Sequence, residues 1–411
     1  MNVVLIGLHF PPELHVASGR VGHLAAAFLR HGHDCTVFTR EPPVAGYGVA
    51  DLERADVVRI SDPSESLRQR IPELPPESGT GQRRRLRAFA RGLLKRASRA
   101  VPLDRHALWA LRVLWSARKL QQADVVIVSV PPLSALFVAW LLAIRKRAKL
   151  VVDYRDALVG NPYNPQGLLL RATQGALERL FTTRADLLTA ATVGLADQLG
   201  AKLGATIHTV FNGYDADLLT EARTRASVAN SLEARALSIV HCGHIFPGKR
   251  DPSALFAALR LIDAPLEVHF YGTNLEHLRT LPDFAPVQDQ VFIHGPVSHL
   301  DSLTAQVGSD ILLYLSWNDP RDAPVLSGKL LEYIGTGKPI LMIGYEHGEA
   351  ARLLHDSGSG QVANTASSIA DFIRAQLGLT RGAQAFTDPR LDSNYSRRTQ
   401  SNRFVDLVMG A

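Results

Sequence analysis

Hydrophobic strands alternate with helices along almost the whole chain, and this alternation limits the possible folds more than any other feature. We expect strands at 3–8, 34–39, 124–130, 149–154, 186–191 and 206–213 in the first half, and at 238–243, 266–272, 291–295, 310–316, 338–344 and 360–364 in the second. Helices are expected between most of them, at 133–146, 167–183, 193–203, 251–262, 299–308, 327–337, 348–357 and 366–377. Strands and helices that alternate at this spacing form a doubly wound parallel sheet.

The chain of 411 residues is too long for one ordinary hydrophobic core. We therefore predict the α/β class, with two doubly wound, Rossmann-like parallel-sheet domains that face a central cleft. The predicted parts are a first domain at 1–213 with a basic helical insertion at about 80–120, a linker at 214–236, a second domain at 237–390 and a C-terminal helix at 391–411. The C-terminal helix can cross back to the first domain.

Cysteine usage and apolar runs argue against export and against a membrane span. Cys35 and Cys242 lie far apart in apolar, strand-like settings, which indicates buried thiols in a reducing compartment. The N-terminus enters a strand at once, without a basic leader. The apolar run at 123–144 contains Asp124 and two prolines, so a buried strand, a turn and a helix explain it better than a membrane span. We expect a cytoplasmic protein.

The net charge of +6 comes from one segment. Residues 83–119 hold twelve Arg and Lys against one acid, Asp104, so the other residues carry a net charge of −5. Residues 83–101 repeat apolar side chains at helical spacing among these cations, a pattern typical of a helix on an anionic membrane surface. A packed helix pair is the alternative. We expect no nucleic-acid partner, because no base-reading element accompanies the charge, and a peripheral position at the inner membrane face is an option.

The loop at 9–20 follows the first strand and can approach an anion. Ala17, Ser18 and Gly19 are small, so backbone N–H groups there are accessible, and the helix that follows adds the positive end of its dipole. Arg20 could add a charge. An ordinary loop before a helix is an equally good interpretation of this stretch alone.

A second loop, at 241–252, carries Lys249 and Arg250 between a strand and a helix. Two cations at such a loop suit a diphosphate, whose negative charge grows as it departs. Solvated surface bases are the alternative.

The most specific stretch is 322–344. Its residues Val325, Leu326, Ser327 and Gly328 are expected to form the first turn of a helix whose free N–H groups can bind an anion. Lys329 lies beside that turn, and Glu332 one turn later can accept hydrogen bonds from two vicinal hydroxyls, as in a ribose. An anion-binding turn followed by an acid that binds a diol is the arrangement expected for a nucleotide diphosphate. A capped helix with a solvent-facing glutamate is the alternative, since Gly337 and Lys338-Pro339 form a routine helix stop.

The stretch "LSGKLLEYIGTGKPILMIG" resembles the donor-binding helix of retaining glycosyltransferases of the GT-B fold, in glycosyltransferase family four. The resemblance extends to "HFPPELHVASGR", "VVDYRDALVGNPY", "TVFNGYD" and "HCGHIFPGKRDP", which stand in the family order between residue 3 and about residue 365. It implies the GT-B fold and a nucleotide diphosphate sugar as donor.

The resemblance also implies roles for single residues. Glu332 matches the acid that binds the ribose, Lys249 or Arg250 the base that neutralises the diphosphate, and Gly19 the glycine near the distal phosphate. His244 stands where many members have an arginine. Asn212 and Gly213 are expected to end a strand facing the cleft, and the strand end at Gly295 is expected to contact the base.

One position departs from the family pattern. The first acid of the family's pair should stand seven intervening residues before Glu332, and that position is Pro324. Asp322 or Asp319 could supply this carboxylate from a shifted loop. Which hydroxyls of the sugar are bound is therefore open.

The acceptor is expected on the first domain. The stretch VVDYRD ends a strand, so Asp153, Arg155 and Asp156 would face the cleft, and His15 belongs to the same side. The resemblance places an acceptor-side residue near Asp156, which could orient or deprotonate the incoming hydroxyl. An ion pair between Arg155 and Asp156 that holds the loop is the alternative.

We interpret the chain as a retaining, metal-independent glycosyltransferase with no cofactor, with a UDP-sugar as the favoured donor and a hydroxyl acceptor that is lipid-linked or a surface-polysaccharide precursor. Two alternatives stay open: a nucleotide-sugar epimerase or hydrolase of the same fold, and an inactive nucleotide-binding scaffold.

Overall fold

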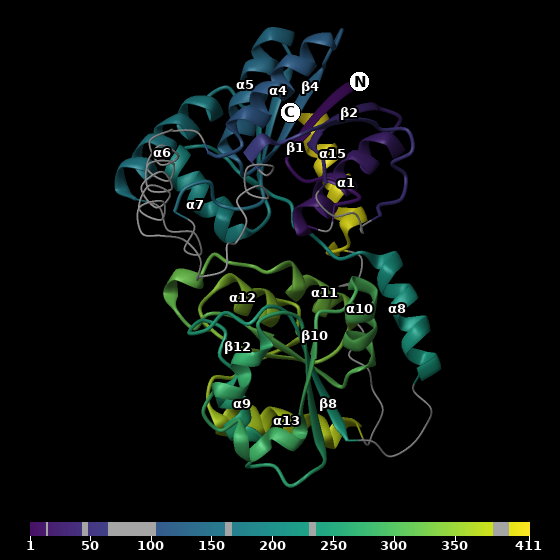
Figure 1. The fold of residues 1–411 in the computed structure, drawn as a ribbon, viewed down its shortest axis with the longest axis vertical. Coiled ribbons are helices and arrows are strands. Elements are labelled where there is room, and N and C mark those ends of the chain that lie inside the picture. The colour runs from purple at the N-terminus through teal and green to yellow at the C-terminus, as the bar shows by residue number, and fades with distance from the viewer. Residues whose placement is uncertain (14, 43–47, 65–103, 161–166, 230–235, 381–393) are drawn as a thin grey trace, which may run out of the picture. The chain divides into compact units, whose positions relative to one another are not determined.

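The computed structural model describes residues 1–13, 15–42, 48–64, 104–160, 167–229, 236–380 and 394–411 (Figure 1). The chain divides into two compact units. The first contains Met1–Ala191, Leu195–Val210 and Ser401–Ala411, and the second contains Thr192–Gly194 and Phe211–Gln400. The basic stretch at 83–101 lies outside the described residues.

The first unit is built on a parallel sheet of seven strands in the order β3-β2-β1-β4-β5-β6-β7. The strands are β1 (Asn2–Gly7), β2 (Asp34–Arg40), β3 (Asp56–Ile60), β4 (Val125–Val130), β5 (Lys149–Tyr154), β6 (Leu187–Ala190) and β7 (His208–Thr209). Every residue of β4 is buried. Its β-branched run is typical of a central parallel strand that is covered on both faces.

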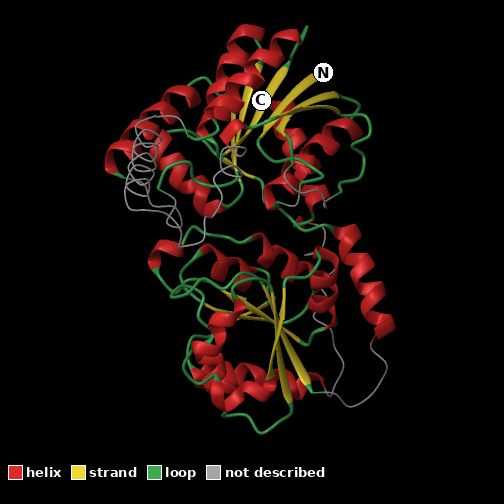
Figure 2. Cartoon of the chain, in the orientation of Figure 1, coloured by secondary structure: helices red, strands yellow, loops and turns green. Residues whose placement is uncertain are grey.

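Helices cover both faces of this sheet (Figure 2). One face packs against α4 (Ala107–Ser116), α5 (Leu133–Lys146), α6 (Leu168–Thr182) and α7 (Val193–Leu203), and the other against α1 (Val16–Arg30) and α15 (Arg397–Gly410). Phe404, Val405 and Val408 of α15 are buried in the core that also contains Phe28. The last eleven residues thus complete the core of the first unit.

The second unit has a parallel sheet of six strands in the order β10-β9-β8-β11-β12-β13. The strands are β8 (Leu237–Cys242), β9 (Leu266–Tyr271), β10 (Val291–Gly295), β11 (Ile311–Leu315), β12 (Ile340–Ile343) and β13 (Gly360–Val362). One face packs against α9 (Ser253–Leu259) and α13 (Ala366–Thr380). The other packs against α10 (His299–Gly308), α11 (Gly328–Thr336) and α12 (Glu349–Asp356).

The described residues also form short 3-10 helices. They are η1 (Ala117–Lys119), η2 (Leu275–Thr280), η3 (Ala285–Gln290) and η4 (Pro320–Asp322). Within the described residues, no helix has both the length and the apolar content needed to cross a membrane.

The predicted linker at 214–236 is wrong over most of its described length, because Ala216–Ala229 forms the helix α8. Leu219 and Ala222 of α8 are buried with Tyr214 and Leu303 in a small cluster against α10. Leu219, Ala222 and Ala226 follow a helical spacing. The polar, alanine-rich composition of the segment concealed this apolar pattern. The strand expected at 206–213 is also much shorter, and β3 was not expected.

Candidate functional site

Three glycines lie at the carboxyl ends of neighbouring strands in the second sheet. Gly243 follows β8, Gly272 follows β9 and Gly295 ends β10. A Cβ on Gly272 would lie 2.0 Å from the carbonyl oxygen of Gly243, and Gly272 has a φ of +138°. A side chain is therefore excluded at Gly272, where the ends of β8 and β9 meet. In open α/β sheets this edge is the one that binds ligands.

Cationic side chains gather at the end of β8. The Lys329 ammonium is so close to Gly243 that a Cβ there would lie 2.6 Å from Lys329 Nζ. Burial lowers the pKa of Lys329, and the charge of Arg250 lowers it further while Glu332 opposes both. Burial, Arg250 and Lys329 likewise lower the pKa of His244. Cations gathered closely enough for Arg250 to lower the pKa of both Lys329 and His244 form a site suited to an anion.

Arg250 contributes further to this site. Its Nη1 donates to the carbonyl of His244 at 3.3 Å, and its guanidinium lies 4.8 Å from the ring centre of Phe246. The buried Nε of Arg250 has no hydrogen-bond partner in the part of the chain that the structure describes. This N–H group of Arg250 can therefore donate a hydrogen bond to a ligand beside Lys329.

The start of α11 lies at the same end of the sheet. Ser327 caps the helix by accepting from the Lys329 amide, although at a long 3.4 Å, and the amide of Ser327 itself donates to Tyr314 Oη at 3.4 Å. Val325 and Leu326 precede the helix instead of forming its first turn as expected, and Gly328 is its first residue; all three are partly exposed. Gly337, with a φ of 74°, ends the helix in the left-handed conformation that favours glycine. The helix start, with its adjacent cations, therefore lies three residues later than predicted, at Gly328.

Glu332 lies one turn along α11 and is already hydrogen-bonded. His299 Nε2 donates to its Oε1 at 3.0 Å, and Arg397 Nη2 lies 3.8 Å from the same oxygen. Burial would raise the pKa of Glu332, but the His299 hydrogen bond and the charges of His299, Arg397 and Lys329 hold it below its ordinary value. Glu332 is therefore an ionised acceptor, as the binding of ribose hydroxyls requires.

His299 and Arg397 were not among the residues expected from the sequence. His299 begins α10, and Arg397 begins α15. The Arg397 amide donates to the carbonyl of Tyr214, and its side chain also lies 3.8 Å from Asp215. Nothing in the sequence relates these distant segments to Glu332.

His241 lies beneath this site and is fully buried. Its Nδ1 donates to the carbonyl of Leu313 at 2.9 Å, while its Nε2 has no partner among the described residues. Burial lowers its pKa to about 3, with Lys329 and Arg250 adding to the effect. His241 is therefore neutral in the folded protein near neutral pH.

The folded protein should lose stability as the pH falls from about 6.5 toward the low folded pKa of His241. In this window the unfolded chain binds a proton and the folded chain does not, so the free energy of unfolding decreases by at most about 1.4 kcal/mol per pH unit. Above this pH window, His241 adds no pH dependence to the free energy of unfolding. Denaturant titrations of His241→Asn at pH 5 and 7 should show a smaller difference than wild type, whereas His347→Asn, at an exposed position, should not. Equal differences in all three proteins would refute this assignment.

The surroundings of Lys249 and of Asp322 differ from those expected from the sequence. Lys249 Nζ lies 4.5 Å from the ring centre of Trp317, and Arg321 lies 4.2 Å from the same ring. Asp322 is buried and accepts from the Trp317 amide at 3.1 Å, so it does not offer a carboxylate to a sugar. Hydrogen bonds from Arg321 lower the pKa of Asp319 to about 2.

In the first unit, the expectations for Asp153 and Arg20 are wrong. Asp153 is fully buried, and it accepts hydrogen bonds from Arg20 at 2.8 and 2.5 Å, from Thr189 at 2.8 Å and from Ser129 at 3.2 Å. Arg20 also donates to the carbonyl of Val210 at 2.9 Å. These hydrogen bonds connect β4, β5 and β6 with helix α1 inside the first unit. Neither Asp153 nor Arg20 therefore faces a ligand.

Arg155 and Asp156 follow β5 without forming the ion pair that was the alternative. Arg155 Nη2 donates instead to the carbonyl of Pro131, and within the described residues no Arg155–Asp156 contact is short enough for an ion pair. The Asp156 residue is exposed, yet protein atoms around its carboxyl raise its pKa and Arg155 opposes this. A carboxyl with a raised pKa suits proton transfer.

The loop after β1 forms a compact polar cluster. His15 caps α1 by accepting from the Ala17 amide at 3.1 Å, and its ring stacks on His9 at 3.7 Å. Burial lowers the pKa of His15 to about 4, with His9 and Arg155 adding to the effect. Glu13 is hydrogen-bonded to His9 and forms an ion pair with Arg40. Gly19 is buried in the first turn of α1.

Asn212 is partly buried after β7, and Gly213 has a packing role. Gly213 has a φ of +67°, and a Cβ there would lie 2.7 Å from the Arg397 amide nitrogen. The segment at 395–397 therefore passes directly over this glycine.

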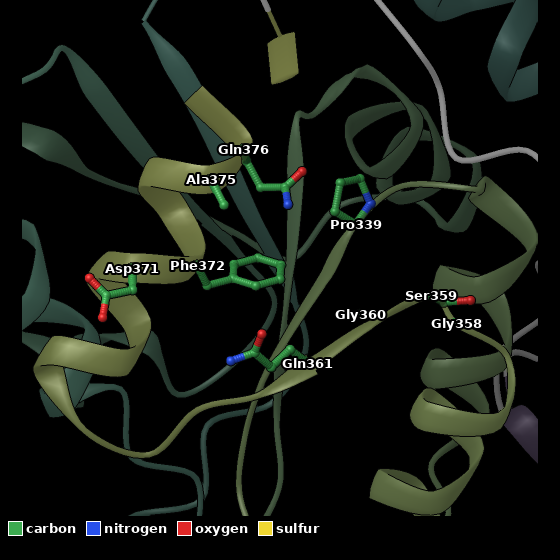
Figure 3. Close-up of a pocket in the computed structure, with 9 residues that line it drawn as sticks. All are labelled: Pro339, Gly358, Ser359, Gly360, Gln361, Asp371, Phe372, Ala375 and Gln376. Atoms are coloured by element: carbon green, nitrogen blue, oxygen red, sulfur yellow. The ribbon is translucent and has the colours of Figure 1, made fainter. Parts of the chain in front are cut away.

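A hollow of about 330 Å³ lies elsewhere in the second unit (Figure 3). It is lined by Pro339, Gly358, Ser359, Gly360, Gln361, Asp371, Phe372, Ala375 and Gln376. Pro339 and Gly360 mark the amino ends of β12 and β13, so the hollow is at the opposite edge of the sheet from Lys329. The residues described include no cluster of three or more His, Cys, Asp or Glu that could hold a metal ion.

Comparisons with known proteins agree with this architecture. Residues 17–214 match the model of the glycosyl transferase 4-like domain. Sucrose-phosphate synthase from Thermosynechococcus elongatus is 14% identical with a TM-score of 0.65, over 100% of this chain and 98% of that one. Anabaena HepE in complex with UDP is 15% identical with a TM-score of 0.63, over 100% of both chains.

A third similar structure is UDP-GlcNAc 2-epimerase from Neisseria meningitidis bound to UDP-GlcNAc, at 13% identity and a TM-score of 0.57 over 100% of both chains. No curated protein matches the sequence. At these identities the structural similarity establishes the fold, and the two-sheet architecture expected from the sequence is confirmed.

Proposed function

Residues 17–214 belong to the glycosyl transferase 4-like family within a chain of the GT-B fold, and from this premise we propose that the protein is a retaining glycosyltransferase. It transfers a hexose-type sugar from a nucleotide diphosphate sugar, with a UDP-sugar favoured, to a hydroxyl acceptor. The acceptor is lipid-linked or a precursor of a surface polysaccharide.

The observation that supports this most is the convergence of Arg250, Lys329 and His244 beside the start of α11, with Glu332 one turn further. The cations and the helix start stabilise the diphosphate as it departs, and Glu332 binds the ribose once its hydrogen bond with His299 is exchanged or shared. The glycine-lined strand ends at Gly243 and Gly295 leave room for the base.

Lys249 supports the diphosphate only if it leaves the Trp317 ring, so Arg250 and Lys329 take the larger share. These cations supply the charge that a metal ion would otherwise provide, which supports a metal-independent reaction.

On the acceptor side, Asp156 is the group that orients or deprotonates the incoming hydroxyl. Arg155 and His15 lie near it, since Arg155 acts on the pKa of both. His15 is neutral at pH 7 because burial depresses its pKa, so it can act as a hydrogen-bond partner without adding charge.

A nucleotide-sugar epimerase or hydrolase is the second candidate, because Pro324 replaces the first family acid and Asp322 is buried. An inactive nucleotide-binding scaffold is the third. The acceptor could be presented at an anionic membrane surface through the stretch at 83–101, which lies outside the described residues.

Mass spectrometry of a panel of nucleotide sugars incubated with the protein separates these candidates. A transferase without its acceptor should slowly release nucleoside diphosphate and free sugar, with the anomeric configuration retained by NMR and the rate unchanged after EDTA treatment. An isomerised sugar would identify an epimerase. Complete donor stability together with nucleotide binding would identify the scaffold.

A further inference from the structure

The outer faces of α4, α5 and α6 combine exposed apolar side chains with cations. Of the twelve large hydrophobic side chains that are exposed in the described residues, seven lie on these helices. They are Leu108, Leu111 and Trp115 on α4, Ile144 on α5, and Leu168, Leu169 and Leu180 on α6. We call these outer faces the apolar-cationic layer.

Helix α4 shows the pattern most clearly. Leu108, Leu111 and Trp115 are 56%, 51% and 62% exposed, and their spacing places them on one side of the helix. The opposite side is buried through Trp109, Ala110 and Val113. The helix is therefore apolar on both sides, although among the described residues of the first unit only one side is packed against a partner.

The same three helices expose no acid. Their single acidic residue is Glu178, which is buried and paired with Lys202. Cations border the apolar side chains, at Arg112 in α4, Arg145 and Lys146 in α5, and Arg171 and Arg179 in α6. The Arg118 guanidinium lies 5.1 Å from the ring centre of Trp115, which places charge directly beside this exposed aromatic side chain.

The helices form one continuous layer. α4 packs on α5, and α5 packs on α6, over the same face of the first sheet (Figure 1). All three begin near the carboxyl ends of the strands, where Arg155 and Asp156 lie. Leu108, Leu168 and Leu169 lie in the first turns, toward this edge, whereas Trp115, Ile144 and Leu180 lie in the last turns.

From the charge and apolar character together, we infer that the apolar-cationic layer binds the surface of an anionic lipid bilayer. Leucine and tryptophan side chains enter the interface, and the surrounding arginines contact anionic headgroups. A second copy of the chain would bring two cationic faces together, and nucleic acid offers no partner for exposed leucines. The presentation of a lipid-linked acceptor at Asp156 rests on the proposed function, whereas binding to lipid does not.

Co-sedimentation of the full chain with vesicles tests this inference. Binding to phosphatidylcholine vesicles that contain about one third phosphatidylglycerol should be at least tenfold tighter than to pure phosphatidylcholine and should weaken with salt. Leu108→Gln, Leu111→Gln and Trp115→Gln together should reduce it at least tenfold. The matched control, Leu261→Gln with Val297→Gln, removes exposed apolar side chains from the second unit and should bind as wild type does.

Thermal melting and donor hydrolysis should be unchanged in the triple variant, so loss of lipid binding is separated from misfolding and from failure of the proposed function. Tryptophan emission should shift to shorter wavelength with anionic vesicles, and Trp115→Phe should remove most of that shift. Absence of binding to anionic vesicles, or wild-type binding by the triple variant, would overturn the inference; the second result would assign binding to other basic residues.

Discussion

Replacing Arg20 with methionine is expected to lower the free energy of unfolding of the first unit by about 3–5 kcal/mol. Arg20 donates two hydrogen bonds to Asp153, which has no exposed surface. Burial would raise the pKa of Asp153, but the charge and hydrogen bonds of Arg20 keep it below its ordinary value. Without Arg20, a carboxylate that must remain buried loses the charge that compensates it.

Guanidinium denaturation measures this effect, and two further variants make it specific. Arg20→Met with Asp153→Asn should be more stable than Arg20→Met alone, because the uncompensated charge is gone. Arg112→Met, at an exposed residue of the same unit that donates to Ser61, should change stability by about 0.5 kcal/mol or less. A small loss in Arg20→Met would show that this pair does not hold the strands together.

The parallel sheets could be predicted because buried parallel strands have continuous β-branched runs, as in β4. Helices with a clear apolar stripe were also predicted well, and the bounds expected at 299–308 match α10. Helix α8 was missed because few of its residues are large and apolar, and its stability depends on packing against α10. Such tertiary contacts leave only a weak local signal.

The error at Asp153 has a similar cause. The strand-end rule placed Asp153 toward a ligand, but strand register aligns it with Ser129 on β4 and Thr189 on β6. These two hydroxyl residues interrupt otherwise apolar strands, so the sequence did contain a sign of a buried polar row. Their pairing with an arginine on α1 could not be predicted without the register.

The cationic site could be predicted better, since Lys329 and Arg250 both lie near carboxyl ends of strands in one sheet. The partners of Glu332 could not, because His299 is 33 positions away and Arg397 lies on the last helix. Only the folded chain brings them together.

Replacing Lys329 and Glu332 together with alanine is expected to weaken donor binding at least about a hundredfold, since each charged contact contributes about 1.5–3 kcal/mol. Lys329 is the cation nearest Gly243, and Glu332 is ionised because His299, Arg397 and Lys329 lower its pKa despite burial. Turnover should fall by at least the same factor, because the departing diphosphate loses a cation.

A matched control removes one base and one acid from the surface of the same unit. Arg279 and Glu276 form an exposed pair at 3.2 Å, three positions apart as Lys329 and Glu332 are. Arg279→Ala with Glu276→Ala changes the charges equally and should leave donor binding unaltered.

Calorimetric titration of UDP and UDP-glucose into wild type, the Lys329→Ala, Glu332→Ala variant and the Arg279→Ala, Glu276→Ala control tests most directly whether the start of α11 binds the nucleotide diphosphate. We predict saturable binding to wild type and control, and binding to the first variant that is weaker by at least about two orders of magnitude. Equal affinity in all three proteins would place the nucleotide elsewhere and contradict the account.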